Sequence, residues 1–164
     1  MIFVCVGSRP YQFNRLIEEL DRLVAAGCVR SEMFAQIGAS TYEPQHFAFE
    51  RFMDPDAFRA KMAEATIVIS HGASGSIMGA LNAGKRVIAV ARLEKYKEHI
   101  NDHQVAINQT LADEGLVLAV EEMGELGEAI EKMELAQVNL RSWENEHPTA
   151  IIDAIDEYIQ SEVL

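Results

Sequence analysis

A turn rich in glycine and serine opens a predicted helix in the middle of the chain. Residues 70–76 read Ser-His-Gly-Ala-Ser-Gly-Ser after an apolar run. Gly72 and Gly75 allow a close backbone approach or a positive φ, while Ser74 and Ser76 can cap a helix or donate hydroxyls to an anion. Because the first N–H groups of a helix have no acceptor within it, the turn predicts a phosphate site, although it matches neither the dinucleotide-binding nor the P-loop pattern. The alternative is a tight turn that binds nothing.

A second polar stretch follows the next predicted strand. Residues 95–104 read Lys-Tyr-Lys-Glu-His-Ile-Asn-Asp-His-Gln and lead into a predicted helix. Because the carboxyl ends of parallel strands meet at one edge of a sheet, this stretch and the glycine turn should line one pocket. His103 and Gln104 are suited to recognising sugar hydroxyls or phosphate. His99 and His103 are four residues apart, a spacing that two zinc ligands on one helix can have, but no third ligand is evident and we predict no metal. A solvated loop with incidental histidines stays open.

Short apolar runs alternate with amphipathic segments over most of the chain. Residues 2–6 form a continuous apolar run, which is typical of a strand buried on both faces, and Asp54 followed by Pro55 predicts a helix start. This alternation predicts an α/β domain, a Rossmann-like parallel sheet with flanking helices. The predicted strands cover 2–6, 33–37, 47–52, 66–70, 86–91 and 116–120, and the predicted helices cover 13–24, 55–65, 74–83, 102–114 and 123–135.

The tail differs from the rest of the chain. Residues 1–142 are predicted to form the Rossmann-like domain, and the pattern breaks at 143–148. Residues 149–163 then carry one apolar stripe, so 143–164 is predicted to end in an amphipathic helix. Either this helix packs on its own domain, or part of its stripe docks on a partner.

The composition excludes several classes of partner. The chain has 164 residues and a net charge of −12, with 14 basic residues scattered among 26 acidic ones. This balance argues against nucleic acid, because phosphate backbones need basic stripes. Cys5 and Cys28 are too few for a disulfide framework, and we expect reduced thiols. The N-terminus does not resemble a signal peptide, and no apolar run approaches the roughly 20 residues of a membrane span. We therefore expect a cytoplasmic protein that only a partner would hold at a membrane.

Five segments occur in the order seen in one enzyme family: IFVCVGSRPYQFNRLI, AQIGASTY, ISHGASGSIMGAL, GKRVIAVARL and EHINDHQ. Over roughly residues 1–120 the chain resembles the C-terminal domain of family 28 glycosyltransferases. The resemblance extends to stand-alone members, such as the catalytic subunits of dolichol-linked N-acetylglucosaminyl transferase and of bacterial exopolysaccharide glycosyltransferases. It implies a single half of a GT-B glycosyltransferase, the half that binds the nucleotide-sugar donor.

The predicted donor-binding residues lie in three loops at one edge of the sheet, most of them by position in the family's motifs. They are Gly7, Ser8, His71, Gly72, Ser74, Gly75 and Ser76 toward the diphosphate, and His103 and Gln104 toward the sugar hydroxyls. The sequence also departs from the family pattern. Many members continue G-S-x-x-E, whose carboxylate binds the ribose hydroxyls, but that position is Gly79 here. The VPR of relatives is VAR at residues 90–92.

The resemblance implies an inverting, metal-independent hexosyltransferase that needs no cofactor. It would move a sugar from a UDP-sugar to a lipid-linked acceptor in glycan or polysaccharide biosynthesis. The general base would lie on a separate, membrane-anchored acceptor-binding subunit, so no catalytic residue is assigned in this chain and activity is expected only with that subunit. Because Gly79 replaces the acid, the main alternative is a non-catalytic nucleotide-sugar-binding regulatory module, and an NAD-linked enzyme is a weaker one. The sequence leaves self-association open.

Overall fold

The computed structural model describes residues 1–144, and the predicted tail helix lies outside the described residues. Six parallel strands form one sheet in the order β3-β2-β1-β4-β5-β6. The strands are β1 (Ile2–Cys5), β2 (Met33–Gln36), β3 (Ala48–Glu50), β4 (Ile67–Ser70), β5 (Arg86–Val90) and β6 (Leu118–Val120). The helices are α1 (Asn14–Ala25), α2 (Pro55–Glu64), α3 (Ser74–Asn82), α4 (His103–Asp113) and α5 (Leu126–Glu134), with short 3-10 turns η1 (Glu94–Tyr96) and η2 (Met123–Glu125). The predicted Rossmann-like fold is confirmed.

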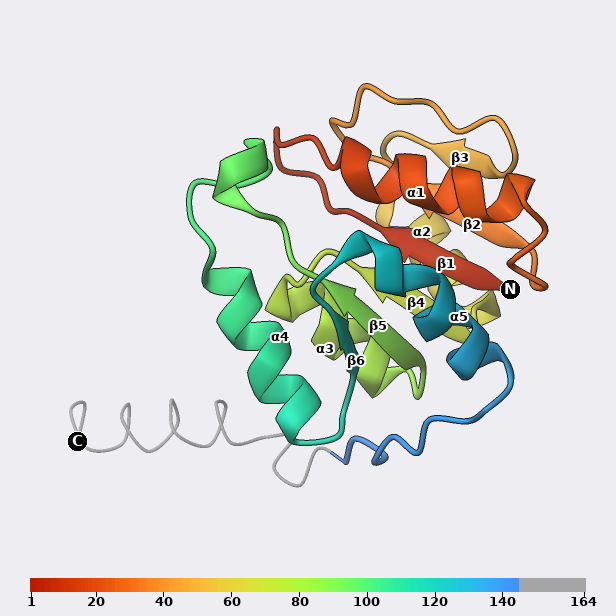
Figure 1. Cartoon of the computed structure of the whole chain (residues 1–164), viewed down its shortest axis with the longest axis vertical. Coiled ribbons are helices and arrows are strands. Elements are labelled where there is room, and N and C mark those ends of the chain that lie inside the picture. The colour runs from red at the N-terminus through yellow and green to blue at the C-terminus, as the bar shows by residue number, and fades with distance from the viewer. Residues whose placement is uncertain (145–164) are drawn as a thin grey trace, which may run out of the picture.

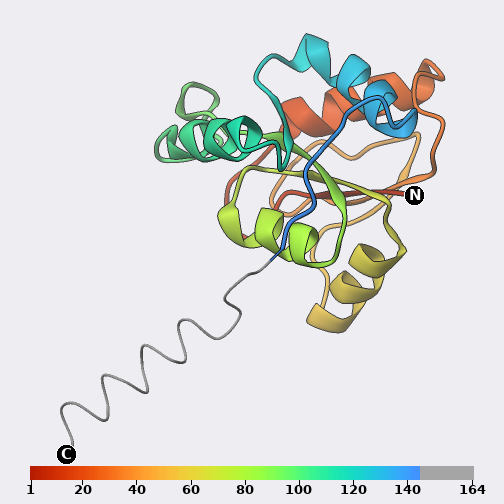
Figure 2. The same ribbon diagram turned by 90° about the horizontal axis from the view of Figure 1, so that it is seen from below.

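Helices cover both faces of the sheet. α1 and α5 lie on one face and α2 and α3 on the other, as Figures 1 and 2 show from two directions. Alternate strand residues enter two separate cores. In β1, Ile2 and Val4 pack with α1 and α5, whereas Phe3 and Cys5 pack with α2 and α3. Every residue of β1 and β4 is buried, because helices cover both of their faces.

The predicted elements agree with the observed ones except near some boundaries. The Asp54 side chain caps α2 as predicted, accepting from two backbone N–H groups, and Pro55 is the first helical residue. The helix predicted at 123–135 divides into η2 and α5, and the turn η1 was not predicted. β6 begins at residue 118 rather than 116, because only Leu118–Val120 pair with β5. None of the helices in residues 1–144 is long and apolar enough to cross a membrane.

The strand order creates a crevice at the carboxyl ends of β1 and β4. β1 lies inside the sheet, with β2 on one side and β4 on the other, so the chain runs in opposite directions from this point. The loops after these two strands therefore diverge, and open parallel sheets bind their ligands where this happens. The fold places the glycine–serine turn at that position.

Candidate functional site

A pocket of about 560 Å³ lies at this crevice. Its walls come from the loop after β1, the start of α3, the end of β5 and the loop that leads into α4. All but one of the predicted donor-binding residues line it: Gly7, Ser8, His71, Ser74, Gly75, Ser76, His103 and Gln104. The sequence reasoning missed Arg9 and Arg92, because single arginines in loops carry no pattern that marks a site.

The helix α3 presents an uncapped N-terminus to the pocket. Its N-cap is Ala73 and no side chain caps its first turn, so of the two roles that the sequence left open for Ser74 and Ser76, capping the helix is not found. The physical reason is position: a side chain caps from the residue before the helix, whereas both serines lie within the first turn. The free N–H groups and the positive end of the helix dipole are therefore left for a ligand.

The two glycines of the turn act differently. Gly72 has a φ of +69°, and a Cβ there would lie 2.9 Å from the side-chain oxygen of the buried Asn108, so this position requires glycine. It shapes the turn without lining the pocket. The positive φ considered for Gly75 is not found, because this residue is already inside α3. A Cβ on Gly75 would meet no atom within 4 Å, so the missing side chain leaves open space at the helix start.

His71 lies beneath the loop that follows β1. Its Nδ1 is 3.0 Å from the backbone oxygen of Cys5. The loop passes close over the ring, because a Cβ on Gly7 would lie 2.8 Å from His71 Nε2, and Gly7 has a φ of +79°. Burial, with a further contribution from the positive charge of Arg92, lowers the pKa of His71 to about 4. The imidazole is therefore neutral at pH 7 in the free protein.

Arg92 brings a buried positive charge to the floor of the pocket. It is 1% exposed, and its Nη2 donates to the backbone oxygens of Val6 (2.7 Å) and Tyr11 (3.1 Å). Among the described residues no carboxylate forms a salt bridge with it, and its Nε has no hydrogen-bond partner. Burial lowers the pKa of Arg92 to about 10, which leaves it charged at pH 7. The charge of Glu98 acts on Arg92 through space, but Glu98 is already paired with Arg15, so the buried cation favours an anionic ligand.

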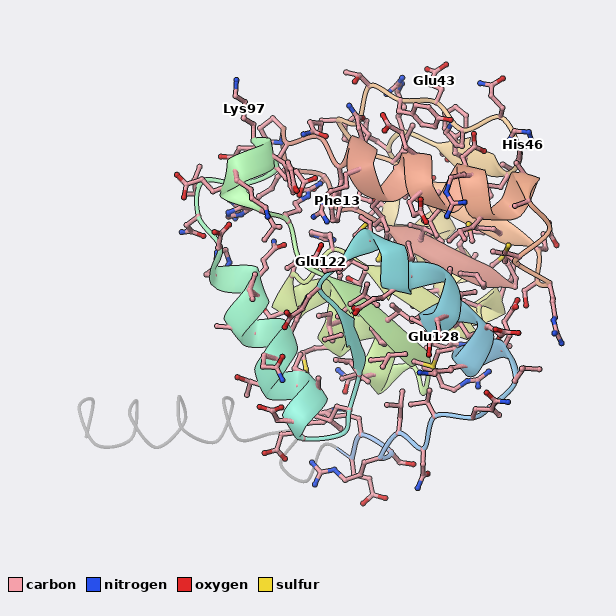
Figure 3. The ribbon with its side chains drawn as sticks, viewed as in Figure 1. Phe13, Glu43, His46, Lys97, Glu122 and Glu128 are labelled. Atoms are coloured by element: carbon pink, nitrogen blue, oxygen red, sulfur yellow. The ribbon has the colours of Figure 1, made fainter. Side chains whose placement is uncertain are left out.

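The loop between β5 and α4 is anchored by a buried ion pair. Glu98 is fully buried, and both of its carboxylate oxygens accept from Arg15 of α1 at 2.9 Å. Glu98 also accepts from the backbone N–H of Leu93. Lys97, which has a left-handed backbone, projects outward from the tip of this loop (Figure 3). The ion pair thus ties the loop to α1 and positions the pocket residues that follow it.

His99 and His103 do not share a helix as their spacing suggested. His99 belongs to the loop, and α4 begins at His103. Their ring centroids are nevertheless 4.8 Å apart, and His99 also lies 5.3 Å from the ring of Tyr11. Residues 1–144 contain no group of three or more side chains that could hold a metal ion. Burial, and the nearby His103, lower the pKa of His99. The close contact of the two rings and this lowered pKa both follow from the crowding of side chains at one wall of the pocket.

Gln104 and Gly79 bear on how a sugar and a ribose would be held. Gln104 lines the pocket, but it is buried and its Oε1 accepts from the backbone N–H of Arg92 at 3.0 Å, which leaves its amide N–H₂ for other contacts. Gly79 lies on α3 with open space where a Cβ would be. No aspartate or glutamate lines the pocket, so no described carboxylate takes the place of the missing acid.

The pocket has a charge opposite to that of the protein. Five of its lining residues can carry a positive charge and none can carry a negative one: Arg9, His71, Arg92, His99 and His103. The whole chain has a net charge of −12. Positive side chains and an open helix N-terminus therefore converge at one place on an acidic molecule, an arrangement suited to a phosphate or diphosphate group.

The comparisons with known proteins agree with this geometry. The chain matches the glycosyltransferase family 28 C-terminal domain over residues 1–159. Two relatives, the UDP-N-acetylglucosamine transferase subunit ALG13 of Mus musculus and of Homo sapiens, are 29% and 30% identical over 125 residues. These matches cover 69% and 70% of this chain but 10% of each relative, so the chain corresponds to a small part of those proteins.

Solved structures show which fold this is. The chain is similar to the glycotransferase of kitacinnamycin, with a TM-score of 0.57 and 16% identity over 81% of this chain and 34% of that one. It is also similar to MurG of Acinetobacter baumannii, with a TM-score of 0.53 and 16% identity over 83% of this chain and 41% of that one. At this identity the likeness shows the fold alone, one Rossmann-like half of the GT-B architecture. With the match over nearly its whole length, the chain belongs to the glycosyltransferase family 28 C-terminal domain family.

Proposed function

We propose that this chain is the donor-binding, catalytic subunit of a two-subunit glycosyltransferase. It binds a UDP-sugar, and the sugar is transferred to a lipid-linked acceptor held by a membrane-anchored partner subunit. The observation that carries the proposal is the pocket at the β1–β4 crevice, whose titratable lining residues are all basic. The family supports glycosyl transfer, and the ALG13 relatives, named as subunits of a UDP-N-acetylglucosamine transferase, support a UDP-linked donor and a partner.

The pocket suits the departure of a nucleoside diphosphate. When the bond between the sugar and the diphosphate breaks, negative charge grows on the phosphate oxygens. The free N–H groups at the start of α3 and the buried charge of Arg92 are fixed before the reaction, so they stabilise that charge without reorganising. These groups give the proposed reaction a route that needs no metal ion.

The acceptor side of the reaction is assigned to the partner. Inversion at the anomeric carbon needs a base beside the acceptor hydroxyl, and no aspartate or glutamate lines the described pocket. The other half of a GT-B enzyme faces the carboxyl edge of this sheet, where that base would lie. We include peripheral membrane attachment through the partner in the proposal, and we assign residues 143–164 as a candidate docking segment.

A second candidate is a regulatory module that binds a nucleotide sugar without catalysing transfer. Gly79 favours this candidate, because many family members have an acid at this position. Apart from its chain neighbours and the backbone of its own helix, no described atom lies within 4 Å of where a Cβ would be, so no neighbouring group takes the place of the acid. The two candidates differ in what happens when the chain is withdrawn. A catalytic subunit is required for transfer, whereas a regulatory module only changes the rate.

The test measures transfer from a radiolabelled UDP-sugar to membrane lipid. Membranes from cells that lack the chain, the purified chain alone and the two combined are compared. The proposal expects transfer only in the combination. Transfer at full rate by the chain and a lipid-linked acceptor with no other protein contradicts the two-subunit assignment, and transfer by the depleted membranes alone supports the regulatory module.

A further inference from the structure

The hydrogen bond of His71 fixes which nitrogen of its ring carries the proton. A carbonyl oxygen can only accept, so Nδ1, 3.0 Å from the oxygen of Cys5, is the donor. In a neutral imidazole the other nitrogen, Nε2, then has a lone pair and no proton. Within residues 1–144 no group donates to Nε2. The ring therefore offers the pocket an acceptor, although the proposed ligand there is a diphosphate.

A phosphate oxygen is also an acceptor, so Nε2 of the neutral ring cannot form a hydrogen bond with it. Turning the ring does not solve the problem, because the bond to Cys5 would be lost in a site where His71 is only 6% exposed. The remaining solution is the imidazolium, which donates from both nitrogens. Nε2 lies close to Gly7, and both His71 and Gly7 line the pocket in which we propose that the diphosphate binds.

Burial is the main reason that His71 is neutral before a ligand binds, and the positive groups around it add to this effect. Arg92 at the end of β5, Arg9 in the loop after β1, and His99 and His103 on the wall beside α4 all line the same pocket and can be positive. The serines of α3 are uncharged. On β1, burial raises the pKa of Cys5 to about 11, so its thiol is neutral too. The negative charge of Glu98, in the loop after β5, acts on Arg92, but this carboxylate is fully buried in its ion pair with Arg15 and does not line the pocket. A bound diphosphate would therefore bring negative charge into the pocket itself.

We infer that His71 takes up a proton when the diphosphate of a nucleotide sugar binds, so that it is an imidazolium ligand of the leaving group in the complex and a neutral ring in the free protein. This inference rests on the proposed donor-binding function. Its consequence is that binding weakens as the pH rises. The ring is neutral in the free protein, where its pKa is about 4, and charged in the proposed complex, so each binding event takes up one proton and the dissociation constant rises about tenfold per pH unit.

The experiment is isothermal titration calorimetry with UDP-N-acetylglucosamine at pH 7, in buffers of different ionisation enthalpy. This probe is chosen because its diphosphate has no terminal phosphate, a group that itself titrates near pH 6. The slope of the observed enthalpy against the buffer enthalpy gives the number of protons taken up. We expect about one, together with a dissociation constant that rises steeply between pH 5.5 and 7.5.

Two variants locate the proton. In His71→Asn the amide can still donate to the oxygen of Cys5 but has no group at Nε2, and His71→Gln puts a neutral donor near that position. Both should bind more weakly at low pH and lose the proton uptake. The matched control is His46→Asn, because Figure 3 shows His46 on the opposite side of the molecule from the loop at Lys97. It should keep both the uptake and the pH dependence.

The outcomes separate this inference from the proposed function. Binding of the wild-type chain with no proton uptake, or uptake that is unchanged in a folded His71 variant, overturns the inference and leaves donor binding intact. Failure of the wild-type chain to bind UDP-N-acetylglucosamine at any pH overturns the proposed function and the inference with it.

Discussion

Removing Arg15 should destabilise the protein more than removing its partner Glu98. The Glu98 side chain is 0% exposed and the Arg15 side chain is 18% exposed. Arg15→Met therefore strands a fully buried carboxylate, which costs about 3 to 5 kcal/mol of unfolding free energy. Glu98→Gln leaves the Arg15 guanidinium, which still reaches water and still donates to the backbone oxygen of Ala91. It also removes the charge that acts on Arg92, but no hydrogen bond joins these two side chains, so the substitution should cost roughly 1 to 2 kcal/mol.

The double variant tests the reasoning most sharply. With the carboxylate already neutralised, loss of the arginine no longer leaves a buried charge, so Arg15→Met combined with Glu98→Gln should be more stable than Arg15→Met alone. The matched control is Arg22→Met, which breaks an ion pair with Glu19 whose arginine is 64% exposed and should cost less than about 1 kcal/mol.

Urea denaturation measures these stabilities, and calorimetry measures binding. Because the ion pair positions the loop that carries His99 and leads to His103, variants at Arg15 should weaken binding of UDP-N-acetylglucosamine more than binding of UDP. A double variant less stable than Arg15→Met would refute the buried-charge argument. Equal losses for the two ligands would refute the positioning role.

Three further predictions concern the pocket. Gly75→Val should abolish nucleotide-sugar binding and leave the melting temperature nearly unchanged, because the new side chain fills open space at the start of α3. Gly124→Val, which also meets no neighbouring atom, should bind normally. Normal binding by Gly75→Val would mean that the turn is only structural. Gly72→Ala should lose roughly 2 kcal/mol more unfolding free energy than Gly115→Ala, since both have positive φ but only the former meets Asn108; equal losses in urea denaturation would contradict the clash. The pKa of His71 is about 4 in the folded chain and near 6.5 in the unfolded chain, so its contribution to the free energy of unfolding is complete above pH 6.5 and is lost as the pH falls toward 4. The unfolding free energy of His71→Asn should therefore fall less steeply with decreasing pH than that of the wild type. An identical pH dependence in urea denaturation would disprove this.

The order and type of the main elements could be predicted because local signals agreed with the fold. Continuous apolar runs mark strands buried on both faces, and Asp54 with Pro55 marks the start of α2. The shortening of β6 and the division of the helix at 123–135 depend on pairing and packing with distant segments, which no local pattern reports.

The site was predictable where the chemistry lies in one loop and unpredictable where it comes from several. The glycine–serine turn could be recognised in the sequence, because its glycines and serines are closely spaced within one loop. Arg92 could not be recognised, because its importance comes from its burial and from its position beside the pocket without a direct salt bridge among the described residues, and both are tertiary properties. The same holds for Glu98, which looks like one of many surface acids in the sequence yet is the fully buried anchor of a pocket wall.

The central claim, that the basic pocket binds a nucleotide-sugar donor, is tested most directly by thermal denaturation of the purified chain with UDP-N-acetylglucosamine in the presence of a metal chelator. A ligand that binds only the folded state at a hundredfold excess over its dissociation constant adds about 2.7 kcal/mol to the unfolding free energy. We predict a rise of the melting temperature that corresponds to this gain in unfolding free energy. Gly75→Val should abolish the rise and Gly124→Val should retain it. A melting temperature that UDP, UDP-N-acetylglucosamine and UDP-glucuronate all leave unmoved would contradict the account.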